Sequence, residues 1–157
     1  MSFVTFSGPI RSGTVREGSG RNTGLVELAQ VYSTGDLTGT ATGNYDITAF
    51  ILPQGALVTD ITVDQTTAAA TGTTTVSVGT TSGGAELMAA VATTAGGRFR
   101  GTATAATQAA WSLSTSADTT VYIRNVVGTA TLTAGAFTVT IKYIQRSTSG
   151  ATNPTSV

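Results

Sequence analysis

The chain has 157 residues, enough for one domain with a single hydrophobic core. Charged residues make up only 10% of it, where about 25% is usual, and the formal net charge is zero, so no overall field attracts nucleic acid or an acidic membrane. The absence of Cys and His excludes disulfides, Cys or His metal ligands and the common nucleophile–base pairs, and with them most hydrolases.

Threonine makes up roughly a fifth of the residues, so it is the main polar residue in a chain with few charges. Because it is β-branched and carries a hydroxyl group, it suits the exposed face of a strand, and this composition predicts an all-β protein. A surface with few charges, and seven arginines against one lysine, favours partial burial in an assembly, with lineage bias as the alternative explanation. No secretion signal or membrane span is expected, so we expect synthesis in a cytoplasm.

The first 24 residues show neither a strand nor a helix period and contain frequent glycine. Residues 1–24 are therefore predicted to form an extended arm. Its apolar anchors and evenly spaced basic residues would be Phe3, Phe6, Ile10, Arg11, Arg16 and Arg21. Either this arm becomes ordered on a partner surface, or it is a solvated leader whose aromatic residues fold back on the core.

Residues 25–32 are predicted to form the first strand, and 33–44 a loop of about a dozen residues. The segment Phe50–Asp64 is predicted to be a hairpin, because a Pro-Gln-Gly corner with turn chemistry separates two apolar runs. In its second run Leu57, Ile61 and Val63 are expected on the buried face and Asp60, Thr62 and Asp64 on the exposed face.

The middle of the chain alternates short apolar runs with small residues. We expect a turn at 66–72 and a strand at 73–78 that buries Val76 and Val78. Residues 85–91 fit either two turns of helix or a short strand. The single Trp111 is expected in the core, with an interface anchor as the alternative.

The last two predicted strands are 121–126 and 136–144. In the second, Phe137, Val139, Ile141 and Tyr143 alternate with Thr and Lys, which is typical of a strand buried on one side. We therefore predict an all-β domain over 25–146, a two-sheet antiparallel β-sandwich for which a jelly-roll is one form. Residues 147–157 are expected to be a flexible C-terminal tail.

No arrangement of residues indicates catalysis or a cofactor. Asp60 and Asp64 share a strand face, but four residues at about 3.3 Å each place them roughly 13 Å apart, too far to act as a pair. The chain also lacks a phosphate-binding or dinucleotide-binding loop. We expect no enzymatic activity, no cofactor and no metal site, and leave open whether loops assemble a Ca²⁺ site from Asp36, Asp46, Glu86 and Asp118.

The segments 51–64, 75–79 with the Gly83-Gly84 turn, Gly97-Arg98 and 133–143 resemble small virion proteins of tailed bacteriophages, of the head decoration or cement type. The resemblance covers about residues 8–146. It implies a protein of the outer capsid surface that clamps neighbouring capsomers, forms a homotrimer and binds the major capsid protein through a terminal arm. Candidate trimer-interface residues are Arg98, Phe99 and Arg100.

Two alternative functions remain open. A phage tail-fibre or receptor-binding β-module would also be rich in strands, but would be expected to carry an aromatic platform for sugars, and the chain has one Trp and four Tyr. A carbohydrate-binding domain is the other alternative.

Overall fold

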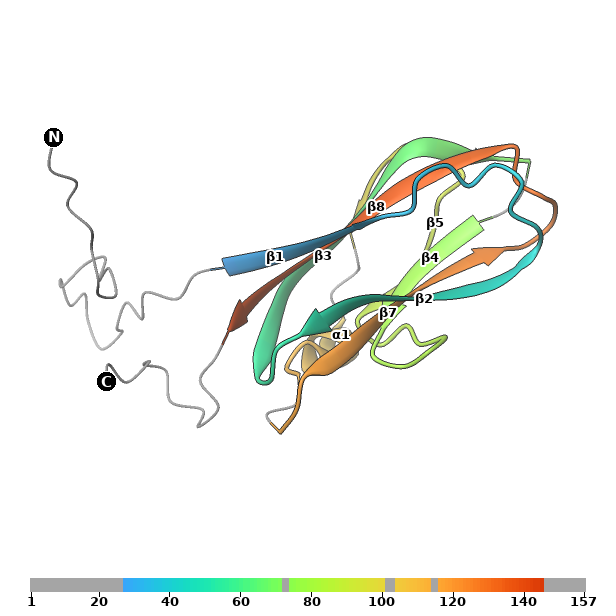
Figure 1. The fold of residues 1–157 in the computed structure, drawn as a ribbon. Helices are drawn as coiled ribbons and strands as arrows, with labels where there is room; N and C mark the ends of the chain where they lie inside the picture. The colour runs from blue at the N-terminus through green and yellow to red at the C-terminus, as the bar shows by residue number, and fades with distance from the viewer. Residues whose placement is uncertain (1–26, 72–73, 101–103, 114–115, 146–157) are drawn as a thin grey trace, which may run out of the picture.

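The computed structural model describes residues 27–71, 74–100, 104–113 and 116–145, which form eight strands and one short helix (Figure 1). The elements are β1 Glu27–Ser33, β2 Gly43–Leu52, β3 Ala56–Ala70, β4 Thr74–Gly79, β5 Met88–Ala92, β6 Gly97–Arg100, α1 Ala105–Ala110, β7 Thr119–Val127 and β8 Ala134–Gln145. The predicted arm 1–24 and tail 147–157 lie outside the described residues.

The strands form two four-stranded antiparallel sheets that face each other. Sheet A has the order β1-β8-β3-β6 and sheet B the order β2-β7-β4-β5. The predicted all-β two-sheet sandwich is therefore confirmed. Among the described strands only β4 and β5 are both consecutive in the chain and neighbours in a sheet, so most connections cross between the sheets. This order is compatible with the jelly-roll form, a double sheet of eight strands.

The predicted hairpin over Phe50–Asp64 is wrong, although its turn is present. Gly55 has a φ of +73°, and the Ala56 amide donates to the Pro53 carbonyl at 3.1 Å. However, β2 pairs with β7, whereas β3 pairs with β6 and β8. A tight turn requires only that two strand ends lie close. Because both strands have an apolar face, they bury it by facing each other across the interior instead of pairing edge to edge.

Strand β3 is longer than predicted, and the residues on its buried face differ from the expected ones. It runs through most of the expected 66–72 turn to Ala70, because β8 continues to pair with it as far as Ala134. A bulge between Val58 and Asp60 shifts the alternation. Val58 is therefore buried with Ile61, and Leu57, expected on the buried face, is only half-buried.

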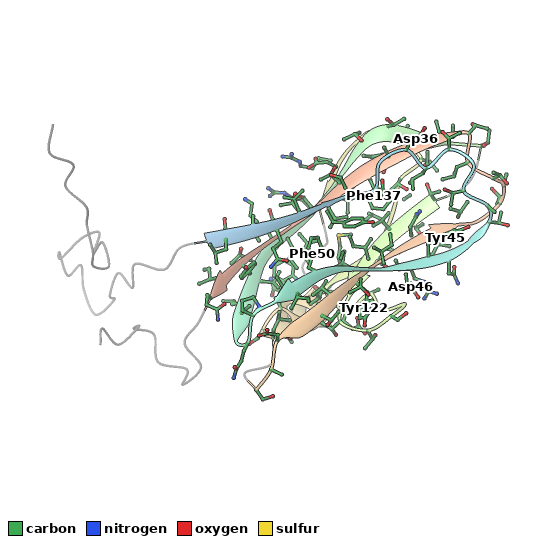
Figure 2. The ribbon with its side chains drawn as sticks, in the orientation of Figure 1. Asp36, Tyr45, Asp46, Phe50, Tyr122 and Phe137 are labelled. Atoms are coloured by element: carbon green, nitrogen blue, oxygen red, sulfur yellow. The ribbon has the colours of Figure 1, made fainter. Side chains whose placement is uncertain are left out.

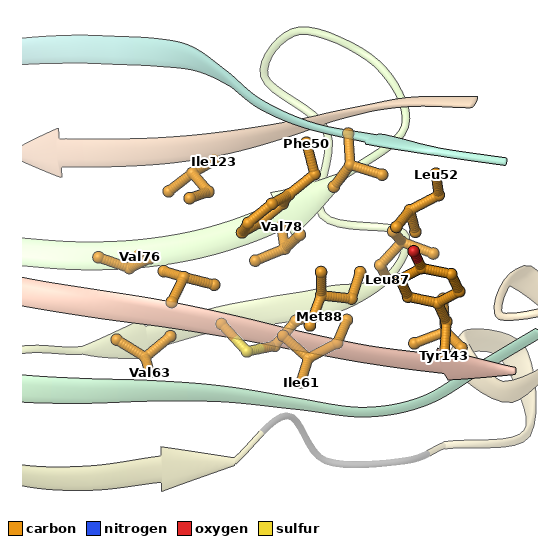
Figure 3. Close-up of a cluster of buried hydrophobic side chains, with 14 of the residues drawn as sticks. Phe50, Leu52, Ile61, Val63, Val76, Val78, Leu87, Met88, Ile123 and Tyr143 are labelled. Carbon is orange, nitrogen blue, oxygen red and sulfur yellow. The ribbon is translucent and has the colours of Figure 1, made fainter. Parts of the chain in front are cut away.

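Strand β8 has the predicted alternation along its length. Phe137, Val139, Ile141 and Tyr143 all point into the sandwich and are buried. They meet Val76 and Val78 of β4, which are completely buried as expected. Figures 2 and 3 show this apolar layer between the sheets. Its other large, fully buried members include Leu52, Ile61, Val63, Leu87, Met88, Val121 and Ile123.

Local structure in the small-residue segments differs from the sequence expectation. Of the two options for 85–91, the strand forms, as β5 at Met88–Ala92. The helix α1 forms instead at Ala105–Ala110, where none was predicted. Thr104 caps it by accepting from the Thr107 amide, and the Thr107 hydroxyl accepts from the Thr104 amide, a reciprocal capping pair.

The interior of the sandwich should dominate stability, which a pair of identical substitutions can measure. Ile141 is fully buried, whereas Ile51 is 62% exposed on β2. Ile141→Ala should lower the free energy of unfolding by about 2–5 kcal/mol, because it removes buried methylene groups and leaves a cavity. Ile51→Ala should change it by only about 0.5 kcal/mol. Chemical denaturation of both variants checks this, and equal losses would contradict the assigned core.

Candidate interaction surfaces

The predicted trimer-interface residues lie on β6, the edge strand of sheet A. Arg98 binds Asp64 with two hydrogen bonds, from Nε to Oδ1 at 2.6 Å and from Nη2 to Oδ2 at 3.1 Å. Arg100 forms an ion pair with Asp60 at 3.4 Å, and Phe99 packs against the core. The Phe99 side chain is therefore partly buried within the domain. Both arginine side chains remain about two-thirds exposed, at 64% and 66%.

The ion pairs of sheet A arise from strand register. Asp64 lies opposite Arg98, so the two side chains emerge on the same outer face. The hydrogen bond that Arg98 donates to Asp64, together with the negative charge of Asp64, raises the pKa of Arg98. Asp60 and Asp64 thus bind two different arginines and do not form a carboxylate pair.

The outer face of sheet B is partly covered by the loop 80–86. Arg124 of β7 donates from Nη1 to the Gly83 carbonyl at 3.0 Å and forms an ion pair with Asp46 of β2 at 3.4 Å. Ser82 donates to the other Asp46 oxygen at 2.9 Å. Gly83 has a φ of +80°, and a Cβ there would lie 2.4 Å from the Arg124 guanidinium. The positive φ therefore favours glycine at this position, and a side chain there would require the Arg124 guanidinium to move.

Glu86 holds the same loop from its other end. Its two carboxylate oxygens accept from the Thr80 amide at 3.1 Å and the Thr81 hydroxyl at 2.8 Å. Burial raises the pKa of Glu86, but hydrogen bonds from its own backbone, Thr81 and Thr80 outweigh this, and the net pKa is lowered. The charged carboxylate is thus the form that secures the loop.

The four loop carboxylates considered for Ca²⁺ lie in separate hydrogen-bonded settings. Asp36 accepts from the amide and hydroxyl of Thr38, which lowers its pKa, with the side-chain bond as the larger cause. Asp118 accepts from the Gln54 amide at 2.9 Å. In the described part of the chain, no three acidic residues come together in a metal-binding group.

Trp111 contributes to the core, as the first of its two predicted roles requires. It is half-buried, packs against the core cluster and donates from Nε1 to the Leu87 carbonyl at 2.8 Å. Leu87 is itself fully buried, so Trp111 connects the end of α1 to the start of β5.

Exposed apolar side chains occur on two edge strands. Val31 and Leu28 of β1 are 62% and 43% exposed, and Ile51 of β2 is 62% exposed. Gln30 joins these edges, because its side-chain amide donates to the Ile51 carbonyl at 2.9 Å. The predicted partner-binding residues Phe3, Phe6, Ile10, Arg11, Arg16 and Arg21 lie outside the described residues, so their contacts stay predictions.

Sequence reasoning missed the network around Arg124. Gly83 and Gly84 were recognised only as turn residues, yet a Cβ at Gly84 would lie 2.2 Å from the Glu86 carboxylate. The available signal was a glycine-rich loop that ends in an acidic residue. Arg124 itself gave no signal, because its partners come from β2 and from a loop about 40 residues away.

Comparison with known proteins gives limited similarity. No protein-family model matches the chain, and no curated protein sequence matches it. A chain in the acidic stable capsid structure of Helicobacter pylori bacteriophage KHP30 is 16% identical, with a TM-score of 0.48 over 78% of this chain and 94% of that one. A chain in the cyanophage Pam1 capsid asymmetric unit is 22% identical, with a TM-score of 0.47 over 87% and 98%. At these values the likeness supports no statement about function.

Among the described residues, no helix is long and apolar enough to cross a membrane.

The Glu86 interactions predict a pH-dependent contribution to stability. Because folding lowers the pKa of Glu86 from 4.5, its stabilising effect is present above pH 4.5 and is lost as the pH falls through the lowered value. Glu86→Gln should therefore reduce the melting temperature at pH 7, and this difference should shrink at pH 3. The pKa of Asp36 is also lowered, but Asp36 is present in both proteins, so its contribution to the pH dependence is absent from the difference between them. An equal difference at both pH values would contradict this assignment.

Proposed function

We propose that this protein is a structural virion protein of a tailed bacteriophage that decorates the outer capsid and stabilises it by clamping neighbouring capsomers. The sequence resemblance to decoration proteins is the starting point. Glu27 at the start of β1 lies opposite Ile144 near the end of β8, so the segments 1–26 and 146–157 both connect to the same end of the sandwich.

This arrangement suits attachment to a surface. A rigid sandwich would present its two terminal segments, 26 and 12 residues long, from one site, leaving the remainder of the domain outside the shell. The described charges also support a structural role. Arg98, Arg100, Arg124 and Lys142 all bind carboxylates of the same domain. We accordingly propose no enzymatic activity, no cofactor, and no nucleic-acid or membrane partner.

The proposed partner is the major capsid protein, and the proposed site is the virion surface after synthesis in the host cytoplasm. In the arm, Phe3, Phe6 and Ile10 would supply apolar contacts, while Arg11, Arg16 and Arg21 would form charge-assisted bonds to capsid carboxylates. An arginine in such a desolvated pair contributes far more than a rim contact, and its loss costs about 2–5 kcal/mol.

Deletion of residues 1–24 tests the role of the arm. The sandwich should stay folded, because the core described above lies entirely within residues 50–143. Binding to empty capsids of the parent phage should weaken, and protection of those capsids against heat should fall, because a ligand that binds only the assembled state stabilises it by mass action. Co-sedimentation and particle calorimetry measure both effects.

The full-length protein serves as the reference in this experiment. Unchanged affinity of the deleted form would show that the arm is idle, and unfolding would show that it belongs to the core. Failure of the full-length protein to bind capsids, with binding to a glycan array instead, would favour a receptor-binding or carbohydrate-binding module.

The proposed homotrimer gives a separate prediction. Light scattering at micromolar concentration should yield three times the chain mass of 15.7 kDa. If Arg98 and Arg100 contribute to the trimer interface through their exposed guanidinium groups, the double substitution to Ala should shift the mass toward the monomer. A monomeric wild-type protein would contradict the trimer.

A further inference from the structure

The outer edge of sheet A at β1 is an unusually regular free strand edge. Among the described strands β1 pairs only with β8, and its register runs without a bulge from Glu27 opposite Ile144 to Ser33 opposite Thr138. Figure 1 shows β1 at the border of the sandwich. Such an edge presents a row of backbone groups to which another strand can bind.

The hydrogen-bond pattern identifies which groups point outward. The Thr34 amide donates to the Phe137 carbonyl at 3.1 Å, immediately after β1 ends. In an antiparallel ladder, alternate residues exchange backbone hydrogen bonds with the partner strand. The amide and carbonyl groups of Tyr32, Gln30 and Leu28 therefore point toward β8. The amide and carbonyl groups of Ala29, Val31 and Ser33 therefore point away from β8, toward the free edge.

The other three sheet edges carry features that obstruct strand addition. In β2, a bulge between Thr48 and Phe50 breaks the ladder, and the Gln30 side chain occupies the Ile51 carbonyl. β5 has only five residues and a bulged register, and β6 has four residues, of which two are arginines. Short strands, bulges and charged residues are the usual means of blocking an edge.

The side chains of β1 add to this contrast. Its one charged residue, Glu27, is at the very start and binds Thr59 and Lys142. Beyond it, Ala29 and Val31 are exposed on the outer face, and Val31 is 62% exposed. This edge is therefore apolar, and the outward backbone groups of Ala29, Val31 and Ser33 pair with no described strand.

We propose that the β1 edge binds an extended strand of the major capsid protein, which adds to sheet A as a further strand. This inference rests on the proposed function. Residues 1–26 join β1 at Glu27, so a capsid surface that bound this segment would lie next to the beginning of this edge. Backbone pairing would supply affinity, and alternate side chains the specificity.

Two substitutions at one position separate backbone pairing from side-chain contact. Val31→Pro removes an outward-facing amide and leaves the bonds to β8, so free protein should retain its fold, as proline does on the solvent side of edge strands. Its affinity for empty capsids of the parent phage should fall about tenfold or more, because the amide is lost and the ring blocks a neighbouring strand. Val31→Thr keeps the amide and should stay within about threefold of wild type.

Hydrogen exchange of the wild-type protein gives a second measurement that does not depend on a variant. The amides of Ala29, Val31 and Ser33 should become protected on the capsid, whereas those of Gln30 and Tyr32 should be protected in both states. Unchanged affinity of Val31→Pro, or unprotected amides at 29, 31 and 33 in bound protein, would overturn the strand-addition mode while leaving decoration intact. Failure of wild-type protein to bind capsids would overturn both proposals.

Discussion

The burial of two apolar sheet faces against each other is the constraint on which the rest of the structure depends. β8 provides the central row of sheet A, with Phe137, Val139 and Ile141 each exposed by 1% or less. Opposite them, Val76, Val78 and Ile123 of sheet B are completely buried. Because apolar burial is the dominant favourable term in folding, the remaining features adjust to keep these rows in contact.

The irregularities of the strands follow from this constraint. β3 is the longest described strand, and its bulge near Thr59 allows Val58 and Ile61 to point inward together. A second bulge in β2 between Thr48 and Phe50 similarly places Phe50 and Leu52 in the interior. A bulge disrupts the hydrogen-bond ladder at one position and changes which side chains point inward. This is favourable when the residue brought inward is large and apolar.

With the interior apolar, the few charges are confined to the outer faces, where they pair. Arg98 and Arg100 bind carboxylates across sheet A, and Arg124 binds Asp46 and the loop 80–86 across sheet B. These contacts neutralise each face instead of forming a charged cleft. On β1, the exposed Val31 and Leu28 side chains lie beside backbone groups that no described strand pairs, which agrees with a protein proposed to function by attachment.

The alternation of single strands was determined by the sequence itself, because period-2 burial is a local property. This is why the buried rows of β8 and β4, the sandwich class and the turn at Gly55 could all be predicted. Tertiary structure decided which strands pair. The β2–β3 turn crosses between sheets, and β3 extends to Ala70 because β8 is there to pair with it. The candidate surfaces depended on the same choice. Arg98 meets Asp64, Arg124 meets Gly83, and β1 is the border of sheet A among the described strands, because of contacts between residues distant in sequence, which no local pattern encodes.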